Sequence, residues 1–226
     1  MKTSNLWWIT VTLVFSLPAP SSAAVDQNKL VGLVKAIKKM KDGYGITAMY
    51  SVAVSLPKDH WYDLNQVTKP TEEEGKNIAS GDLVFNNNRL AIATVKAPEH
   101  AEWRLLNTLH LDSNEGDLLV IFSYGSPCPN NCANPNDDYT IIKKINAVIS
   151  GGKWGDKVFV FEKIYKPKIK GEIPRDQLET AVRNLGTSSV GLANIFRCFK
   201  PNEVNFRCTS CSDGGGVADD CVNYKA

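Results

Sequence analysis

The sequence predicts a layered α/β domain in which some strands run parallel. Segments of strand composition alternate with single amphipathic helical segments along most of the chain, which is the pattern of α/β folds. The segment 117–124 is a continuous apolar run, typical of a strand buried on both faces. A mature chain of roughly 200 residues is long enough for one domain with a real core.

The first half begins with an amphipathic helix, because Leu30, Leu33, Val34, Ile37 and Met40 fall at helical spacing. Its predicted elements are a helix at 30–41, a strand at 46–56, a long polar loop at 57–80, one or two strands at 82–85 and 89–95, and a short helix from Pro98 to 109. Proline is favoured in the first turn of a helix.

The second half continues the alternation. Its predicted elements are a strand at 117–124, a helix at 139–149, a strand at 156–165, a helix at 175–185 and a last strand at 189–196. Asp137 and Asp138 suit the N-terminus of the helix at 139–149. Three glycines at 214–216 indicate that the cysteine-rich end of the chain is dominated by loops.

The first 24 residues predict a secretory signal peptide. Lys2 precedes an uncharged run at 6–17, and small residues follow at 21–24, as in a leader with its cleavage site. The run is too short for a typical transmembrane helix. We therefore expect cleavage near Ala23 or Ala24, and a secreted protein with no membrane contact afterwards.

The cysteines fall into two groups. Four of the six lie in the last 30 residues, namely Cys198, Cys208, Cys211 and Cys221. In an exported protein these four are expected to form two disulfides, with three connectivities open; a second zinc site at the C-T-S-C of Cys208 and Cys211 is the alternative. The net charge of +2 gives no argument for or against a polyanionic partner.

Cys128 and Cys132 raise a different question, because they form either a disulfide or half of a metal site. His100 and these two cysteines each follow a predicted strand, so adjacent parallel strands would bring them to one edge of the sheet. Zinc takes about four ligands, and three protein ligands leave one position for water, as in catalytic sites. Glu102 lies close enough in sequence to exchange protons with that water.

The pattern H-A-E at 100–102 followed by P-C-x-x-x-C at 127–132 resembles the signature of zinc-dependent nucleoside and nucleobase deaminases. The segment SYGSPC at 123–128 is similar to the S-W-S-P-C element of the AID/APOBEC polynucleotide deaminases. A helix between the last two strands also belongs to that branch. With its leader, the chain from about 30 to 196 most resembles the secreted AID/APOBEC-like deaminases, the SNAD group.

The resemblance implies a three-layer α/β/α cytidine-deaminase-like fold with a mixed five-stranded sheet. It places the deaminase-like domain at 25–197 and a disulfide-stabilised tail at 198–226. One Zn²⁺ per chain would be bound by His100, Cys128 and Cys132, with Glu102 as the proton shuttle. The implied reaction is hydrolysis of the exocyclic amine of cytosine, in preference to adenine, in single-stranded nucleic acid or a nucleoside. A defence role against viral or microbial nucleic acid follows by analogy with the family.

The resemblance also implies where substrate binds. The loop at 162–175, between a predicted strand and a predicted helix, corresponds to one that contacts the nucleotide beside the target base in that family; here it carries Tyr165 with lysines at 163, 166, 168 and 170. We predict substrate contacts from Tyr165, Lys166 and Asn88, although exposed lysines and an Asn-rich turn are the plainer interpretation.

Two points stay open. Three residues separate the cysteines instead of the commoner two, and Pro135 delays the next helix, so Cys132 reaches the metal from a helix or from a loop. A non-enzymatic secreted binding protein, built on the same fold or on a disulfide-stapled module without metal, is the alternative function.

Overall fold

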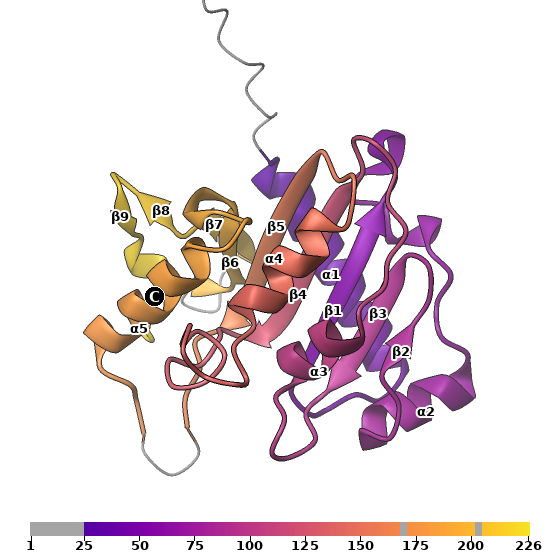
Figure 1. The fold of residues 1–226 in the computed structure, drawn as a ribbon, viewed down its shortest axis with the longest axis horizontal. Coiled ribbons are helices and arrows are strands. Elements are labelled where there is room, and N and C mark those ends of the chain that lie inside the picture. Colours follow the sequence, from indigo (N-terminus) through magenta and orange to yellow (C-terminus); the bar gives the residue numbers. More distant parts are fainter. Residues whose placement is uncertain (1–24, 168–170, 202–204) are drawn as a thin grey trace, which may run out of the picture.

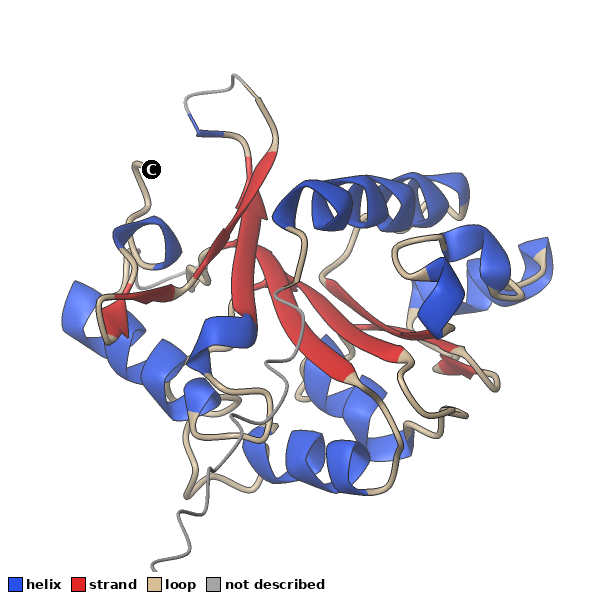
Figure 2. Cartoon of the chain, turned by 90° about the horizontal axis from the view of Figure 1, so that it is seen from above, coloured by secondary structure: helices blue, strands red, loops and turns tan. Residues whose placement is uncertain are grey.

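The computed structural model describes residues 25–167, 171–201 and 205–226. The predicted signal peptide at 1–24 lies outside these residues, as do Lys168 and Lys170. A seven-stranded sheet in the order β2-β3-β1-β4-β5-β6-β7 lies between two layers of helices (Figures 1 and 2). The predicted three-layer α/β/α fold with a mixed sheet is confirmed, with seven strands in place of five.

The helices are α1 Gln27–Gly43, α2 Glu72–Ser80, α3 Ala101–Thr108, α4 Ile142–Ser150 and α5 Arg175–Gly186. The strands of the main sheet are β1 Tyr50–Leu56, β2 Phe85–Asn86, β3 Leu90–Thr94, β4 Leu118–Gly125, β5 Asp156–Lys163, β6 Ile195–Phe199 and β7 Arg207–Ser210. A separate two-stranded hairpin follows, formed by β8 Ser212–Asp213 and β9 Gly216–Val217.

The directions of the strands decide which loops meet. β1 is antiparallel to both β3 and β4, whereas β4, β5 and β6 run parallel and β7 returns antiparallel to β6. The strands β3 and β4 therefore point the same way and end at the same edge. The prediction that they are adjacent was wrong, because β1 lies between them.

The core has two halves, one on each face of the sheet. Val120 and Phe122 of β4 pack with the α1 layer, and the alternate residues Leu119 and Ile121 pack with the helices of the other layer, as the two-residue period of a strand requires. Under α3 the sheet presents three alanines, Ala53, Ala91 and Ala93, which pack against Leu105. Such small side chains let α3 approach the sheet closely, and they hold its first turn at the edge where β3 ends.

Three predicted elements need correction. The polar segment predicted as a loop at 57–80 contains α2, which is stabilised by a capping box between Thr71 and Glu74 and ends at Gly81 in the left-handed region (φ 82°). The helix predicted to begin at Pro98 begins at Ala101, after a cis Ala97–Pro98 peptide. The last strand predicted at 189–196 is β6, which starts only at Ile195.

The acids before α4 do not cap it. Asp137 Oδ1 accepts a hydrogen bond from the Tyr139 N–H at 2.8 Å, in a turn that precedes the helix. The N-cap position of α4 is Ile141, and no side chain caps the helix there.

The tail is more ordered than its glycines predict. Cys198 and Cys208 are cross-strand partners in β6 and β7 and form one disulfide, and Cys211 and Cys221 form the other. The predicted domain boundary at 198 falls inside β6, so the tail continues the main sheet through β7.

Candidate metal centre

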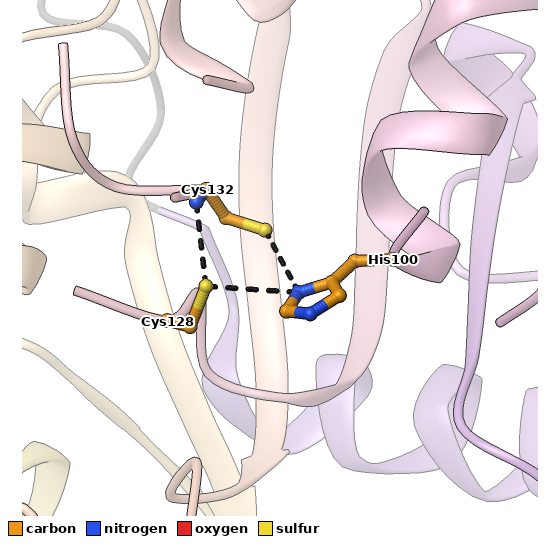
Figure 3. Close-up of side chains that lie close together, drawn as sticks. All are labelled: His100, Cys128 and Cys132. Atoms are coloured by element: carbon orange, nitrogen blue, oxygen red, sulfur yellow. Dashed lines mark hydrogen bonds between the residues drawn. The ribbon is translucent and has the colours of Figure 1, made fainter. Parts of the chain in front are cut away.

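Three potential metal ligands meet at the edge of the sheet where β3 and β4 end. His100 Nδ1 lies 3.2 Å from Cys132 Sγ and 3.6 Å from Cys128 Sγ (Figure 3). The ligand atoms of all three residues lie within 4.8 Å of one another. His100 is the N-cap residue of α3, but its side chain caps no backbone N–H. Its ring faces the two sulfur atoms instead.

The segment from Cys128 to Cys132, called the cysteine loop below, forms a compact turn. The Ala133 N–H donates to the Cys128 carbonyl at 3.0 Å, and the Cys132 N–H donates to Cys128 Sγ at 3.4 Å. Cys132 therefore lies in a turn, and α4 begins only at Ile142. The loop alternative for Cys132 is the one that the structure adopts. Three intervening residues still bring both sulfur atoms to the same side of the turn.

The two thiols are buried and electrostatically unequal. A hydrogen bond from Cys132, together with the one from His100, lowers the pKa of Cys128 well below its usual range. The pKa of Cys132 is raised by its hydrogen bond to Cys128 and by burial. Hydrogen bonding to Cys128 also raises the pKa of His100. A thiolate next to an imidazole and a second thiol is a donor set that a soft divalent cation fits.

Glu102 lies in the first turn of α3, beside the three ligands, and is only 3% exposed. Burial raises the pKa of its carboxyl group. The Ser123 hydroxyl of β4 donates to Glu102 Oε1 at 2.7 Å and holds that oxygen in place. Ser123 was not among the predicted site residues. Its signal was a polar residue within an apolar strand, two positions after Ile121 and therefore on the face that α3 covers.

A cavity of about 70 Å³ opens between these groups. Its lining residues are Met49, Val95, His100, Ala101, Glu102, Ser126 and Tyr165. The ring centroids of His100 and Tyr165 are 6.1 Å apart. Glu102 and His100 thus share one mostly apolar cavity with an aromatic side chain. Nothing in the sequence singles out Met49, because a methionine beside a strand is typical of the core.

Of the three predicted substrate-binding residues, only Tyr165 lines the cavity. Tyr165 lies at the cavity, where its N–H donates to Ser126 Oγ at 3.0 Å. Lys166 is exposed and forms an ion pair with Glu172 at 3.4 Å.

The structure does not bring Asn88 to the site. Asn88 lies in the turn between β2 and β3, where its carbonyl accepts from the Asp112 N–H at 2.6 Å. The length of β3, about 13 Å, separates that turn from the edge that carries His100.

A mixed sheet between two helical layers, with His100, Cys128 and Cys132 gathered beside a buried glutamate, defines a cytidine-deaminase-like protein. A family model described as Secreted Novel AID/APOBEC-like Deaminase 1 matches residues 31–225. The chain belongs to this family, and the match includes the tail. Comparisons with curated proteins and with solved structures returned no match.

The family is secreted by its description, and the two disulfides of the tail are those of an extracellular protein. Across the described ranges 25–167, 171–201 and 205–226, none of the helices combines the length and apolar character needed to cross a bilayer.

Proposed function

We propose that this protein is a zinc-dependent deaminase that hydrolyses the exocyclic amine of cytosine, in preference to adenine. The observation that carries the proposal is the convergence of His100, Cys128 and Cys132, with His100 and the buried Glu102 lining one cavity. Water is the second substrate, and the products are uracil and ammonia.

The donor set fits one zinc ion. Two sulfur atoms and one imidazole nitrogen are preferred zinc ligands, and sites with three protein ligands are the catalytic kind. Among the described residues the cluster supplies these three donors. Bound there, zinc would supply a water nucleophile activated at neutral pH.

Glu102 is the proposed proton carrier. Glu102 lines the cavity, and burial raises the pKa of its carboxyl group, which is the direction that suits a group that takes and returns a proton. It would take the two protons of the water nucleophile in turn and deliver one to the ring nitrogen beside the reacting carbon and one to the amine, which leaves as ammonia. Ser123 would keep Oε1 aimed at the cavity through its 2.7 Å hydrogen bond.

Single-stranded nucleic acid is the proposed polymer substrate, with the free nucleoside as the alternative. Tyr165 offers a ring beside His100 on which a base can stack, a contact worth about 1–3 kcal/mol per base. Lys163 and Lys166, both exposed, flank it and would attract phosphates. In the extracellular space the proposed role is defence against viral or microbial nucleic acid.

The test joins metal analysis to an activity assay. The purified secreted chain is measured for zinc by elemental mass spectrometry, and for uracil formation from cytidine, deoxycytidine and a cytosine-containing single-stranded oligonucleotide. We expect about one zinc per chain and activity that Glu102→Gln removes. A Cys128–Cys132 disulfide without zinc would overturn the proposal and favour a metal-free binding protein.

A further inference from the structure

A single phenol near the end of the chain joins both ends of the connection between β5 and α5. The Tyr224 hydroxyl donates to the Tyr165 carbonyl at 2.6 Å and accepts from the Ile173 N–H at 3.2 Å. Its ring is partly buried and packs in the same hydrophobic cluster as these two residues. The tail therefore reaches the segment that forms one wall of the candidate site.

Tyr165 is held from its other side by the cysteine loop. Its N–H donates to Ser126 Oγ at 3.0 Å, and the Ser126 N–H donates to the Lys163 carbonyl at 2.7 Å. The backbone of Tyr165 thus has one anchor two residues before Cys128 and a second anchor on Tyr224. These two anchors, on the N–H and on the carbonyl, hold the backbone of Tyr165, whose ring centroid lies 6.1 Å from that of His100.

The tail that carries Tyr224 is itself fixed to the body of the fold. The buried guanidinium of Arg197, in β6, donates to the carbonyl oxygens of Asp220 and Asn223. The disulfide between Cys211 and Cys221 closes the chain just before this segment. Tyr224 therefore projects from a rigid base.

No comparably strong tie spans the same two ends among the described residues. The ion pair between Lys166 and Glu172 also joins them, at 3.4 Å, but both side chains are more than half exposed. Solvent screens such a pair, and pairs of this kind contribute little. The paired hydrogen bonds of the Tyr224 hydroxyl are therefore the main polar link.

We infer that Tyr224 is a positioning residue: its hydroxyl ties Tyr165 to Ile173 and so sets the Tyr165 ring beside His100 for substrate binding. The inference deepens the proposed function and rests on it for its effect on substrate. In this arrangement the disulfide-bonded tail acts on the site through one hydroxyl group, at a distance from the metal ligands.

The experiment compares two tyrosine-to-phenylalanine variants of the full secreted chain. Tyr224→Phe removes the hydroxyl and keeps the ring. Tyr62→Phe is the matched control, because the Tyr62 hydroxyl also accepts a backbone N–H, that of Asp26 at 3.1 Å, at the start of α1 and away from the site. Amide hydrogen exchange of the peptide containing Ile173 reports on the tie without any substrate, and steady-state kinetics on a single-stranded oligonucleotide report on its consequence.

For Tyr224→Phe we expect exchange at Ile173 to rise at least about threefold and KM to rise about three- to tenfold, the scale of one hydrogen bond, with kcat changed less than about twofold. Zinc content stays at the wild-type value, and Tyr62→Phe changes none of these quantities. Unchanged exchange at Ile173 overturns the inference, as does faster exchange with an unchanged KM. If the wild-type chain deaminates none of the substrates, the proposed function fails, and the exchange comparison still decides whether Tyr224 holds the two ends together.

Discussion

Two pairs of cysteines in this protein differ in their bonding: one pair forms a disulfide, and the other remains as free thiols. Cys128 and Cys132 lie at the carboxyl edge of the sheet, unbridged and buried, with their sulfur atoms 3.6 and 3.2 Å from His100 Nδ1, respectively. Cys211 and Cys221, in the tail, form a disulfide. The extracellular compartment acts on both pairs alike, so local surroundings must account for the difference.

The main difference between the two pairs is that His100 supplies a third metal-ligand atom beside Cys128 and Cys132. The cysteine loop turns both sulfur atoms toward an imidazole that comes from a different strand and helix, and a buried carboxyl group lies behind it. Among the described residues, no metal-ligand cluster of this kind includes the tail pair, which closes a loop instead. To decide whether a cysteine pair in a secreted chain forms a disulfide or binds a metal, one should therefore ask whether another segment places a histidine beside it.

The largest effect is expected from Cys132→Ser. A serine hydroxyl is a poor zinc ligand beside a thiolate, so we expect zinc content to fall from about one per chain to about one tenth or less. Uracil formation should fall with it to background. Elemental analysis and the deamination assay on the same preparation measure both.

The double variant Cys211→Ser/Cys221→Ser is the control for this experiment, because it removes two sulfur atoms from the other pair. It should keep the zinc. If Cys132→Ser kept its zinc and the double variant of the tail cysteines lost it, the tail pair would be the metal ligands and the assignment of the two pairs would be reversed.

Glu102→Gln should separate metal binding from turnover. The substitution keeps the shape of the side chain and removes its ability to carry a proton, so we expect a loss of about 10²–10⁴ in kcat with zinc retained. Glu99→Gln is the matched control: Glu99 precedes the same helix, is partly exposed and contacts Arg104 at 3.7 Å. It should stay within about twofold of wild type. Equal activity of the two variants would remove Glu102 from the mechanism.

The two tail disulfides give a matched pair of stability variants. Each closes a loop with a sequence separation of 10 residues, for which the chain-entropy estimate is about 2–3 kcal/mol. Losing either should lower Tm by roughly 5–10 °C in a chain of this size. Only Cys211→Ser/Cys221→Ser should also raise KM, because only that disulfide borders the segment with Tyr224.

The variant Cys198→Ser/Cys208→Ser therefore serves as the control for KM, since it loosens β6 and β7 instead. Thermal unfolding and oligonucleotide kinetics on both variants provide the test. A rise in KM of equal size in the two would mean that general loosening, and not the position of Tyr224, affects the site.

The sequence predicted the layered fold and which segments meet at one edge of the sheet, but it missed some of the elements around them. His100, Glu102, Cys128 and Cys132 could be named because parallel strands end at one edge, and this rule holds even with β1 inserted between β3 and β4. The helix α2 was missed because it buries little apolar surface, with Ile78 as its main contact. The strand β7 was missed because the cysteine-rich tail, with its three glycines at 214–216, has the composition of a loop. In the structure β7 pairs with β6, and a disulfide joins the two strands.

The substrate residues show what chain direction adds. Asn88 lies in the turn that leads into β3, and His100 follows the end of that strand, so the two must lie at opposite edges of the sheet. That exclusion was available from the sequence. The tie from Tyr224 to Tyr165 was not, because it joins positions 59 residues apart through a side chain and a backbone carbonyl.

The smallest expected effect concerns Ser123, which binds Glu102. Burial raises the pKa of Glu102, and the hydrogen bond from Ser123 opposes that rise. In Ser123→Ala the pKa of Glu102 should therefore move further up, so less carboxylate is present at any given pH. The acid limb of the pH–rate profile should shift to higher pH, with activity reduced by up to about tenfold on that limb and recovering as the pH increases.

Ser51→Ala is the control for this variant. Ser51 is equally buried, pairs with Ser123 across β1 and β4, and donates to the Phe122 carbonyl at 2.7 Å. It should cost stability of a similar size, about 1 kcal/mol, and leave the acid limb in place. A shift shared by both serine variants would assign the effect to packing of the sheet, whereas a shift confined to Ser123→Ala ties it to the Glu102 carboxyl group. That result would extend the contrast with the tail, where cysteines stabilise the chain without any proton transfer.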